Sequence, residues 1–277
     1  MAMFDNWDIF VENGPKVVTV APIKIESSMV ESQYEDARSA AFFAMGMSIK
    51  RKEPVLLFIS GVYLANIYTA LTEAWFQKAE VIVYAFYNKI SDVNTSWADR
   101  CAKTLTIHID EYNEKHEEIL SYHHMHSPVL INIVGVEIGD EKVEYSNIRE
   151  YISRVDNAAE FVCYNDKIQN KNNIKEEYKY GILSKYIGMS VVKKVGYLIC
   201  DSACMLVDIN IFRTRYANKN MKIIVLDNGK LKENEIDQWI KSNGWKCKRV
   251  KKMDDEAAEW IKIQKEQAVL IVGQGEM

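Results

Sequence analysis

The sequence lacks a strong excess of charge, and it lacks a long uninterrupted apolar run. Its 277 residues carry a formal net charge of -4, which excludes the basic surface of a dedicated nucleic-acid-binding protein. The apolar stretch at residues 55–71 includes Ser60, Asn66 and Thr69, and it is too short and too mixed to span a bilayer. We therefore expect neither a nucleic acid nor a membrane among the partners of this chain.

The chain also lacks paired cysteines and a basic start. Its five cysteines are an odd number without CxxC spacing, a pattern typical of reduced, buried thiols. The opening residues MAMFDNWDIF are acidic where a secretory signal peptide is basic. These features predict a cytoplasmic protein, and an apolar content of 48% is enough to build a full core.

The sequence does contain a regular alternation of strand and helix patterns. In the first half, strands are expected at residues 16–22, 54–60, 80–87, 101–109 and 127–136, and helices at 36–52, 62–78 and 112–124. Continuous apolar runs such as VLLFI are typical of strands that are buried on both faces. Repeated strand–helix units of this kind predict a parallel sheet with helices on both faces.

A second α/β set follows the polar segment at residues 137–156. Its expected strands are 160–165, 195–201, 221–229, 246–252 and 267–273, and its expected helices are 174–194, 206–219, 233–244 and 254–266. The sequence thus predicts an α/β protein of two doubly wound parallel-sheet domains, residues 1–150 and 151–277, with no middle domain between them.

The first half poses a question at Ser60-Gly61, where a buried strand meets a helix pattern. A strand that breaks at Gly and leads into a helix is a common place to bind a phosphate or another polar ligand. The same sequence also suits a simple strand-to-helix connection with no ligand. Both interpretations stay open on the residues alone.

The segment DARSAAFFAMGMSIKRKEPVLLFISGVYLANIYTALTEAWFQKAEVIVYAFY, with SPVLINI downstream, resembles the pyrimidine-binding domain of thiamine-diphosphate-dependent enzymes. It is most similar to the succinyl-enolpyruvyl-hydroxycyclohexene-carboxylate synthases of the menaquinone pathway. The resemblance implies that Ser60 and Gly61 line a cofactor pocket shared between two subunits. It also implies that Ala37 occupies the position of the glutamate that hydrogen-bonds the cofactor's pyrimidine ring.

The segment YLICDSACMLVDINIFRTRYANKNMKIIVLDNGKL is similar to the diphosphate-binding domain of the same family. Asp201 matches the aspartate of its GDG motif, and Asn228 matches the asparagine that follows the next strand. The resemblance implies that Asp201, Asn228 and the carbonyl of Lys230 bind Mg²⁺, with Ser202 beside the diphosphate. Oxygen donors of this kind suit Mg²⁺, which binds through carboxylates and substrate phosphates.

The chain departs from the family at several of these positions. Cys200 and Ser202 replace the two glycines of GDG, and Asp227 replaces an asparagine and adds negative charge. Separately, the His123, His124 and His126 cluster is expected to lie solvated at a helix end rather than to bind a metal. The basic run at residues 246–252 is expected to be a solvated edge strand.

Three functions follow from these observations. The first is a thiamine-diphosphate- and Mg²⁺-dependent decarboxylase or carboligase acting on a 2-oxo acid, as a homodimer or homotetramer. The second is a degenerate, non-catalytic paralogue that keeps the dimeric fold as a binding or structural protein. The third is a pocket for another nucleotide-like or phosphorylated ligand.

Overall fold

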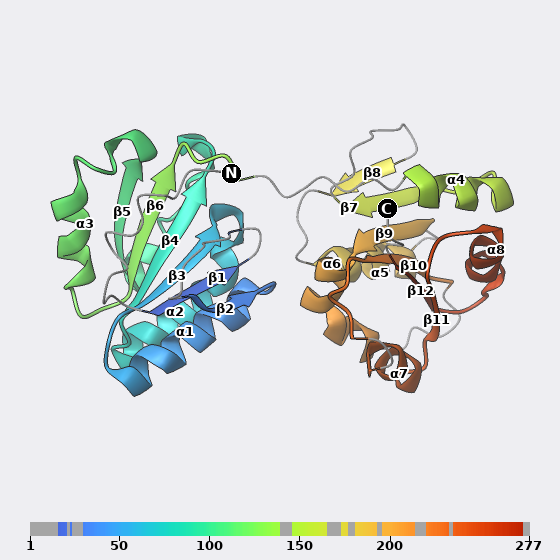
Figure 1. Cartoon of the computed structure of the whole chain (residues 1–277), viewed down its shortest axis with the longest axis horizontal. Coiled ribbons are helices and arrows are strands. Elements are labelled where there is room, and N and C mark those ends of the chain that lie inside the picture. Colours follow the sequence, from blue (N-terminus) through green and yellow to red (C-terminus); the bar gives the residue numbers. More distant parts are fainter. Residues whose placement is uncertain are drawn as a thin grey trace. The chain divides into compact units, whose positions relative to one another are not determined.

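The computed structural model describes residues 16–20, 23, 30–138, 146–164, 173–176, 181–192, 196–213, 220–232 and 235–273. The chain folds as two compact units, unit 1 (Met1–Asp140) and unit 2 (Glu141–Met277). Each unit has its own parallel sheet with helices on both faces (Figure 1). The predicted α/β class with two doubly wound domains is therefore confirmed.

Unit 1 contains, among its described residues, a six-stranded sheet in the order β2-β1-β3-β4-β6-β5. The strands are β1 (Lys16–Val20), β2 (Val30–Tyr34), β3 (Val55–Ser60), β4 (Val81–Tyr87), β5 (Lys103–His108) and β6 (Val129–Val134). The α-helices are α1 (Ala37–Arg51), α2 (Tyr68–Gln77) and α3 (His116–His123). Short 3-10 helices are η2 (Gly61–Ile67), η3 (Ile90–Asp92), η4 (Ala98–Arg100) and η5 (Ile109–Glu111).

Small residues let helix α1 lie close to the sheet of unit 1. Ala37, Ala40, Ala41 and Ala44 recur at helical spacing, and all four are buried. Helix α1 packs over β3 and β4 on one face of the sheet, with α2 beside it. Helix α3 lies on the opposite face, where Ile119 is part of the core. This arrangement covers both faces of β3 and β4, and every residue of these two strands is buried.

Unit 2 contains, within its described ranges, a six-stranded sheet in the order β11-β12-β10-β9-β7-β8. The strands are β7 (Phe161–Tyr164), β8 (Asn173–Glu176), β9 (Tyr197–Asp201), β10 (Lys222–Asp227), β11 (Lys246–Val250) and β12 (Ala268–Gly273). The helices are α4 (Ser146–Val155), α5 (Ile182–Val192), α6 (Ser202–Val207), α7 (Glu235–Ser242), α8 (Asp255–Ile263) and the 3-10 helix η6 (Ile209–Arg213).

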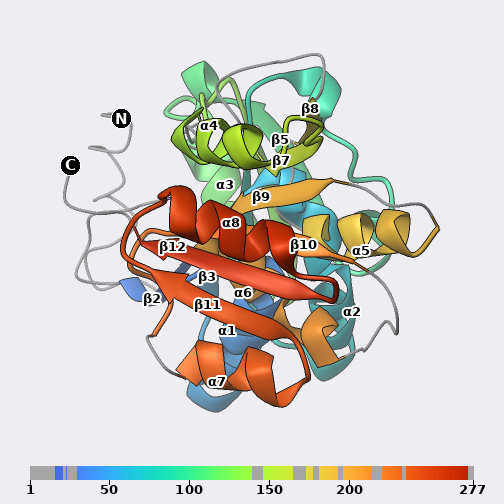
Figure 2. The same cartoon turned by 90° about the vertical axis from the view of Figure 1, so that its right-hand side faces the viewer.

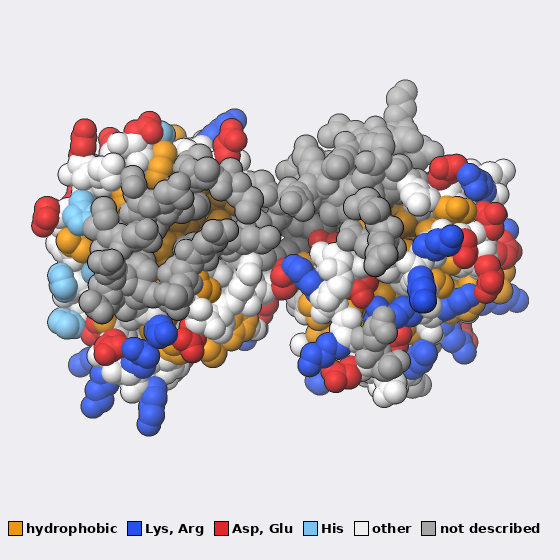
Figure 3. Space-filling view, viewed as in Figure 1, with side chains coloured by type: hydrophobic (Ala, Val, Ile, Leu, Met, Phe, Trp, Pro, Cys, Tyr) orange, Lys and Arg blue, Asp and Glu red, His pale blue; other side chains and the backbone are white. Residues whose placement is uncertain are grey.

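The helices of unit 2 form two layers around its sheet. Helices α4 and α8 pack together over one face, where Ile152 and Ile261 belong to the same core cluster (Figure 2). Helices α5, α6 and α7 contribute to the core cluster on the other face, which includes Phe212 and Trp245. On the side of the molecule shown in Figure 3, basic and acidic side chains are interspersed over each unit.

The two sheets have the same topology. Read from β8 to β11, the order in unit 2 is β8-β7-β9-β10-β12-β11, which matches β2-β1-β3-β4-β6-β5 strand for strand. Strand β3 therefore corresponds to β9, and β4 corresponds to β10. In each sheet the second strand lies on one side of the first strand, and the third strand lies on the other side. Open α/β sheets bind ligands at the carboxyl ends of their strands, where the strand order reverses in this way.

Several expected boundaries in unit 1 differ from the observed ones. Strand β2 was not expected, because its alternating burial at the edge of the sheet gives no continuous apolar run. The helix expected at residues 62–78 begins instead as the 3-10 helix η2 and becomes α-helical at Tyr68. The helix expected at residues 112–124 is shorter and starts at His116.

Unit 2 shows three further differences. The boundary expected between residues 150 and 151 falls inside α4, which packs on α8 in unit 2, and Ile148 and Ile152 belong to the same core cluster as Ala258. Residues 174–176 of the helix expected at 174–194 belong instead to strand β8. Helix α6 starts directly after β9 at Ser202, earlier than expected, and residues 214–219 of the expected helix lie outside the described residues.

Two expectations about composition can be compared with the fold. All five cysteines are free, and they are Cys101, Cys163, Cys200, Cys204 and Cys247. The first four are buried, as predicted for reduced thiols, and the fifth is partly buried. None of the helices in the described ranges has the length and apolar character needed to cross a membrane.

Candidate functional site

The carboxyl ends of β9 and β10 bring three of the predicted site residues together. These strands are parallel neighbours, and their register pairs Asp201 with Leu226. Asn228 therefore lies two residues beyond Leu226, directly after the end of β10. The hydroxyl of Ser202 donates a hydrogen bond to the side-chain oxygen of Asn228. The structure thus places Asp201, Ser202 and Asn228 at one edge of the unit 2 sheet.

Asp201 joins β9 to helix α6. Its Oδ1 accepts a hydrogen bond of 2.9 Å from the backbone N–H of Cys204, so the carboxylate is the N-cap of the helix. Burial raises the pKa of the Cys200 and Cys204 thiols well above their ordinary value, and the charge of Asp201 raises both further. Both thiols therefore remain protonated near neutral pH and are poor nucleophiles.

Asp227 organises the turn that follows β10. Its Oδ1 accepts hydrogen bonds from the backbone N–H groups of Gly229, at 3.0 Å, and Leu231, at 3.2 Å. Gly229 has a φ of 84°, a conformation that favours glycine. The turn at residues 228–231 carries the exposed Asn228 and Lys230 past the end of the strand. One buried carboxylate therefore fixes the turn that holds two of the predicted metal ligands.

Arg249 pairs with Asp227, a contact that was not predicted from the sequence. Its Nη1 lies 2.6 Å from Oδ2 of Asp227, and its Nη2 lies 2.8 Å from Oδ1 of Asp237 on α7. Burial alone lowers the pKa of Arg249, but Asp237 and Asp227 outweigh this effect and raise it. The expectation that the whole basic run is solvated is wrong at Arg249, because alternate residues of edge strand β11 face the core.

The oxygen groups at this edge suit Mg²⁺ chemically. Asp201 offers a carboxylate, Asn228 an amide oxygen and Lys230 a backbone carbonyl, and Mg²⁺ prefers such donors together with phosphate oxygens. The Ser202 hydrogen bond occupies one of the two lone pairs on the Asn228 oxygen, which leaves the other for a ligand. Arg249 offsets part of the negative charge of Asp227, because the same guanidinium also pairs with Asp237. The residues present therefore fit a Mg²⁺–diphosphate group.

In unit 1, Gly61 has a packing role at the end of β3. A Cβ atom at this position would lie 2.1 Å from Cε1 of the buried Tyr87 side chain on β4. The close approach of the Tyr87 ring therefore requires glycine at position 61. Ser60 is also buried, with 5% of its surface exposed, and it makes no side-chain cap for η2.

Ala37 is the first residue of α1 and is completely buried. The carboxylate immediately before it, Asp36, is the N-cap of α1. It accepts hydrogen bonds from the N–H groups of Arg38 and Ser39, both at 3.2 Å, and from the Ser39 hydroxyl at 2.6 Å. Position 37 therefore supplies no carboxylate, and the neighbouring Asp36 already serves the helix.

The histidine cluster divides into separate environments. His126 lies 81% exposed, with Nδ1 2.8 Å from Oε1 of Glu80. His123 instead packs against the sheet, with Nε2 2.7 Å from the hydroxyl of the buried Tyr84. The expectation of a solvated helix end is wrong for His123, because α3 turns this side chain toward β4. Among the described residues, no group of three or more His, Cys, Asp or Glu could hold a metal.

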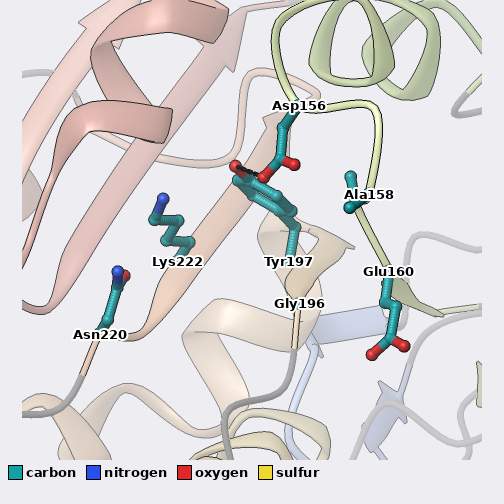
Figure 4. A pocket seen from close by; sticks show the side chains of 8 residues that line it. Asp156, Ala158, Glu160, Gly196, Tyr197, Asn220 and Lys222 are labelled. Atoms are coloured by element: carbon teal, nitrogen blue, oxygen red, sulfur yellow. Dashed lines mark hydrogen bonds between the residues drawn. The ribbon is translucent and has the colours of Figure 1, made fainter.

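A cavity of about 210 Å³ lies at the opposite, amino edge of the unit 2 sheet (Figure 4). It is lined by Asp156, Ala158, Ala159, Glu160, Gly196, Tyr197, Asn220 and Lys222. Within it, the Tyr197 hydroxyl donates a 3.0 Å hydrogen bond to Asp156, and Lys222 lies over the Tyr197 ring and donates to the carbonyl of Lys262. These groups bind one another, and ligands of open α/β sheets bind at the other edge.

The fold and the strand-end residues place the chain among doubly wound α/β proteins with polar side chains at a carboxyl sheet edge. The sheet order in both units fits thiamine-diphosphate-type domains. No family model matches the chain. A segment of 85 residues is 32% identical to the 2-succinyl-5-enolpyruvyl-6-hydroxy-3-cyclohexene-1-carboxylate synthase of Bacillus cytotoxicus. The match covers 30% of this chain and 15% of that protein.

Proposed function

We propose that the chain binds thiamine diphosphate with Mg²⁺ at the carboxyl ends of β9 and β10. We propose further that it uses this cofactor on a 2-oxo acid as a decarboxylase or carboligase. The observation that carries the proposal is the meeting of Asp201, Ser202 and Asn228 on adjacent strand ends. The similarity to the Bacillus cytotoxicus synthase supports the choice of cofactor.

Each residue has a defined part in this proposal. The carboxylate of Asp201, the amide oxygen of Asn228 and the carbonyl of Lys230 hold the metal, and Ser202 orients the Asn228 oxygen. Bound thiamine diphosphate supplies the carbanion chemistry that reactions of 2-oxo acids require. Ser60 and Gly61 border the cofactor pocket without taking part in a chemical step. Because position 37 is alanine, we expect catalysis to be slower than with a carboxylate there.

A second candidate function is favoured by one observation, the complete burial of Ala37 at the start of α1. A chain without the pyrimidine-binding carboxylate can keep the ligand site and lose the reaction. In that case the protein is a non-catalytic paralogue that binds the cofactor or a related diphosphate. Consumption of pyruvate and other 2-oxo acids by the protein loaded with thiamine diphosphate and Mg²⁺ separates the two functions, because the paralogue consumes none.

The proposed ligand predicts a stabilisation that requires both components. A ligand at a hundred times its dissociation constant adds about 2.7 kcal/mol to the free energy of unfolding. For domains of this size, that corresponds to a rise of about 5 °C in melting temperature. We expect this rise with thiamine diphosphate and Mg²⁺ together, and a smaller one with either alone, because the metal joins protein to phosphate. Differential scanning calorimetry measures it.

Asp201→Ala and Asp254→Ala form a matched pair for this experiment. Asp254 caps α8 through the Ala257 N–H at 2.8 Å, just as Asp201 caps α6. Each substitution removes an N-cap and costs about 1 kcal/mol of stability without ligand. Only Asp201→Ala should also abolish the rise in melting temperature. An equal rise in both variants would place the ligand elsewhere, and no rise in the unmodified protein would reject the proposed ligand.

We also propose that the chain forms a homodimer or homotetramer through the outer surface of α1, η2 and α2. Large apolar side chains are exposed on these packed elements, and they are Phe43, Ile49, Val62, Tyr68, Trp75 and Phe76. The Phe76 residue is 76% exposed in the single chain, an unusual position for a large aromatic side chain. Burial of these side chains against a second copy removes apolar surface from water.

The assembly proposal predicts that Phe76→Lys yields monomers. The substitution places a charge within the proposed interface, where it loses its hydration without a partner. Ile263→Lys is the matched control, because Ile263 is 58% exposed on α8 in unit 2 and lies outside the proposed surface. Light scattering should show a dimer or larger species for the unmodified protein and the control, and a particle of 32.0 kDa for Phe76→Lys. A monomeric unmodified protein at micromolar concentration would refute the assembly.

A further inference from the structure

Three charged side chains from three elements meet beneath the candidate site. Asp227 ends β10, Arg249 lies on β11, and Asp237 lies in the first turn of α7. Besides its contacts through Nη1 and Nη2, Arg249 directs Nε at both carboxylate oxygens of Asp237, at 3.2 Å each. The side chains of Asp227, Asp237 and Arg249 are 7%, 13% and 17% exposed, so solvent screens the network little.

Arg249 reaches Asp227 across an intervening strand. Strand β12 lies between β11 and β10, and its register pairs Gly273 with Asp227 and Ile271 with Arg249. Side chains of alternate residues share one face of a sheet, so Gly273 is the residue of β12 that lies next to Asp227 on that face. The guanidinium of Arg249 therefore passes over Gly273 to reach Asp227 on the same face of the sheet.

The network acts directly on the turn at residues 228–231. Asp227 uses Oδ2 for Arg249, and it uses Oδ1 for the backbone N–H groups of Gly229 and Leu231. A carboxylate that is held on one side by a planar guanidinium has little freedom to rotate away from its other partners. The orientation of the turn therefore depends on an arginine that is more than twenty residues away in the chain.

We infer that Arg249 is a positioning residue that holds the turn carrying Asn228 and Lys230 in a geometry ready for ligand binding. Its link to Asp237 fixes the guanidinium to α7, so α7 and β11 together support the turn through Asp227. The expected effect of Arg249 on ligand affinity rests on the proposed function. The effect of Arg249 on the turn itself can be measured without any ligand.

Hydrogen exchange of the Gly229 and Leu231 amides tests the inference in the protein alone. Arg249→Met should speed exchange of these two amides at least tenfold, while Ile224 and Val225 within β10 keep their rates. Lys248→Met is the matched control, because Lys248 is the adjacent residue of β11 and pairs with the exposed Glu256 rather than with the Asp227–Asp237 network. If Arg249→Met does not fold, Arg249→Lys replaces it, since a single ammonium cannot bridge two carboxylates as the guanidinium does.

Titration with thiamine diphosphate and Mg²⁺ gives the second measurement, at a temperature where circular dichroism shows each variant to be folded. We expect about tenfold weaker binding for the Arg249 variant and unchanged binding for Lys248→Met. Exchange rates at Gly229 and Leu231 that stay within twofold of the unmodified protein overturn the inference, and so does faster exchange with unchanged affinity. If the unmodified protein binds neither component, the proposed function fails, and the exchange rates still decide whether Arg249 holds the turn.

Discussion

Gly61→Ala should lower the free energy of unfolding by about 3 kcal/mol, the upper end of the cost of overpacking a core. The added Cβ would lie 2.1 to 2.4 Å from three atoms of the Tyr87 ring, and the ring is only 4% exposed. The ring cannot leave without moving other buried side chains, because protein cores are closely packed. Chemical denaturation followed by circular dichroism measures the loss.

Gly46→Ala is the matched control for this substitution. Gly46 lies within α1, and a Cβ there would meet no atom within 4 Å. Alanine is favoured over glycine in a helix, so this variant should gain about 0.5 to 1 kcal/mol. In a double-mutant cycle, Tyr87→Ala should remove most of the cost of Gly61→Ala. A cost that persists without the ring would mean that Gly61 is required for another reason.

The continuous apolar strands of both sheets could be predicted from the sequence, because burial on both faces requires unbroken runs such as those of β3 and β12. The edge strand β2 could not, since its residues alternate between partly buried and exposed and resemble a loop. Helix α4 was assigned to a polar connection for a similar reason. The helix has few apolar side chains, and Ile148 and Ile152 are among them. They are buried because α8, more than a hundred residues later in the chain, packs against them.

The candidate site was predicted in part. The position of Asp201 and Asn228 at adjacent strand ends follows from the spacing of two strands and from the rule that parallel strands end at one edge. The Ser202 hydrogen bond and the Arg249 network depend on side-chain contacts between distant segments. A basic run such as residues 246–252 gives no sign that Arg249 is partly buried and bound to two carboxylates.

Because the two sheets have the same topology, equivalent positions in the two units can be compared directly. Gly61 follows β3 as Ser202 follows β9, and Tyr87 ends β4 as Asp227 ends β10. In unit 1 this pair of positions is filled by an aromatic ring against a glycine, which closes the edge with apolar packing. In unit 2 the same edge presents hydroxyl, amide and carboxylate groups. The polar edge of unit 2 is therefore the better place for a metal and a phosphate.

Lowering the pH from 7 to 5 should destabilise the protein by about 2 kcal/mol through His123 alone. Burial, together with the nearby charges of His124 and His116, lowers the pKa of His123 from 6.5 to about 4. The folded protein therefore holds His123 neutral, in a hydrogen bond with the Tyr84 hydroxyl. In the unfolded chain, His123 takes up a proton below pH 6.5. Since the unfolded state binds more protons, this contribution is complete above pH 6.5 and is lost as pH falls toward 4.

His123→Gln should flatten this part of the pH dependence, because glutamine keeps a hydrogen-bonding group near Tyr84 but does not titrate. His126→Gln is the matched control, since His126 lies near the same helix end, is 81% exposed and is not among the charges that lower the pKa of His123. Free energies of unfolding from urea titrations at pH 7 and pH 5 should differ by about 2 kcal/mol less in His123→Gln than in the control. Both variants also contain the buried Tyr84, so a general effect of acid on the core appears equally in each. Equal pH dependence in the two variants would show that His123 is protonated without unfolding, and that its contact with Tyr84 tolerates the charge.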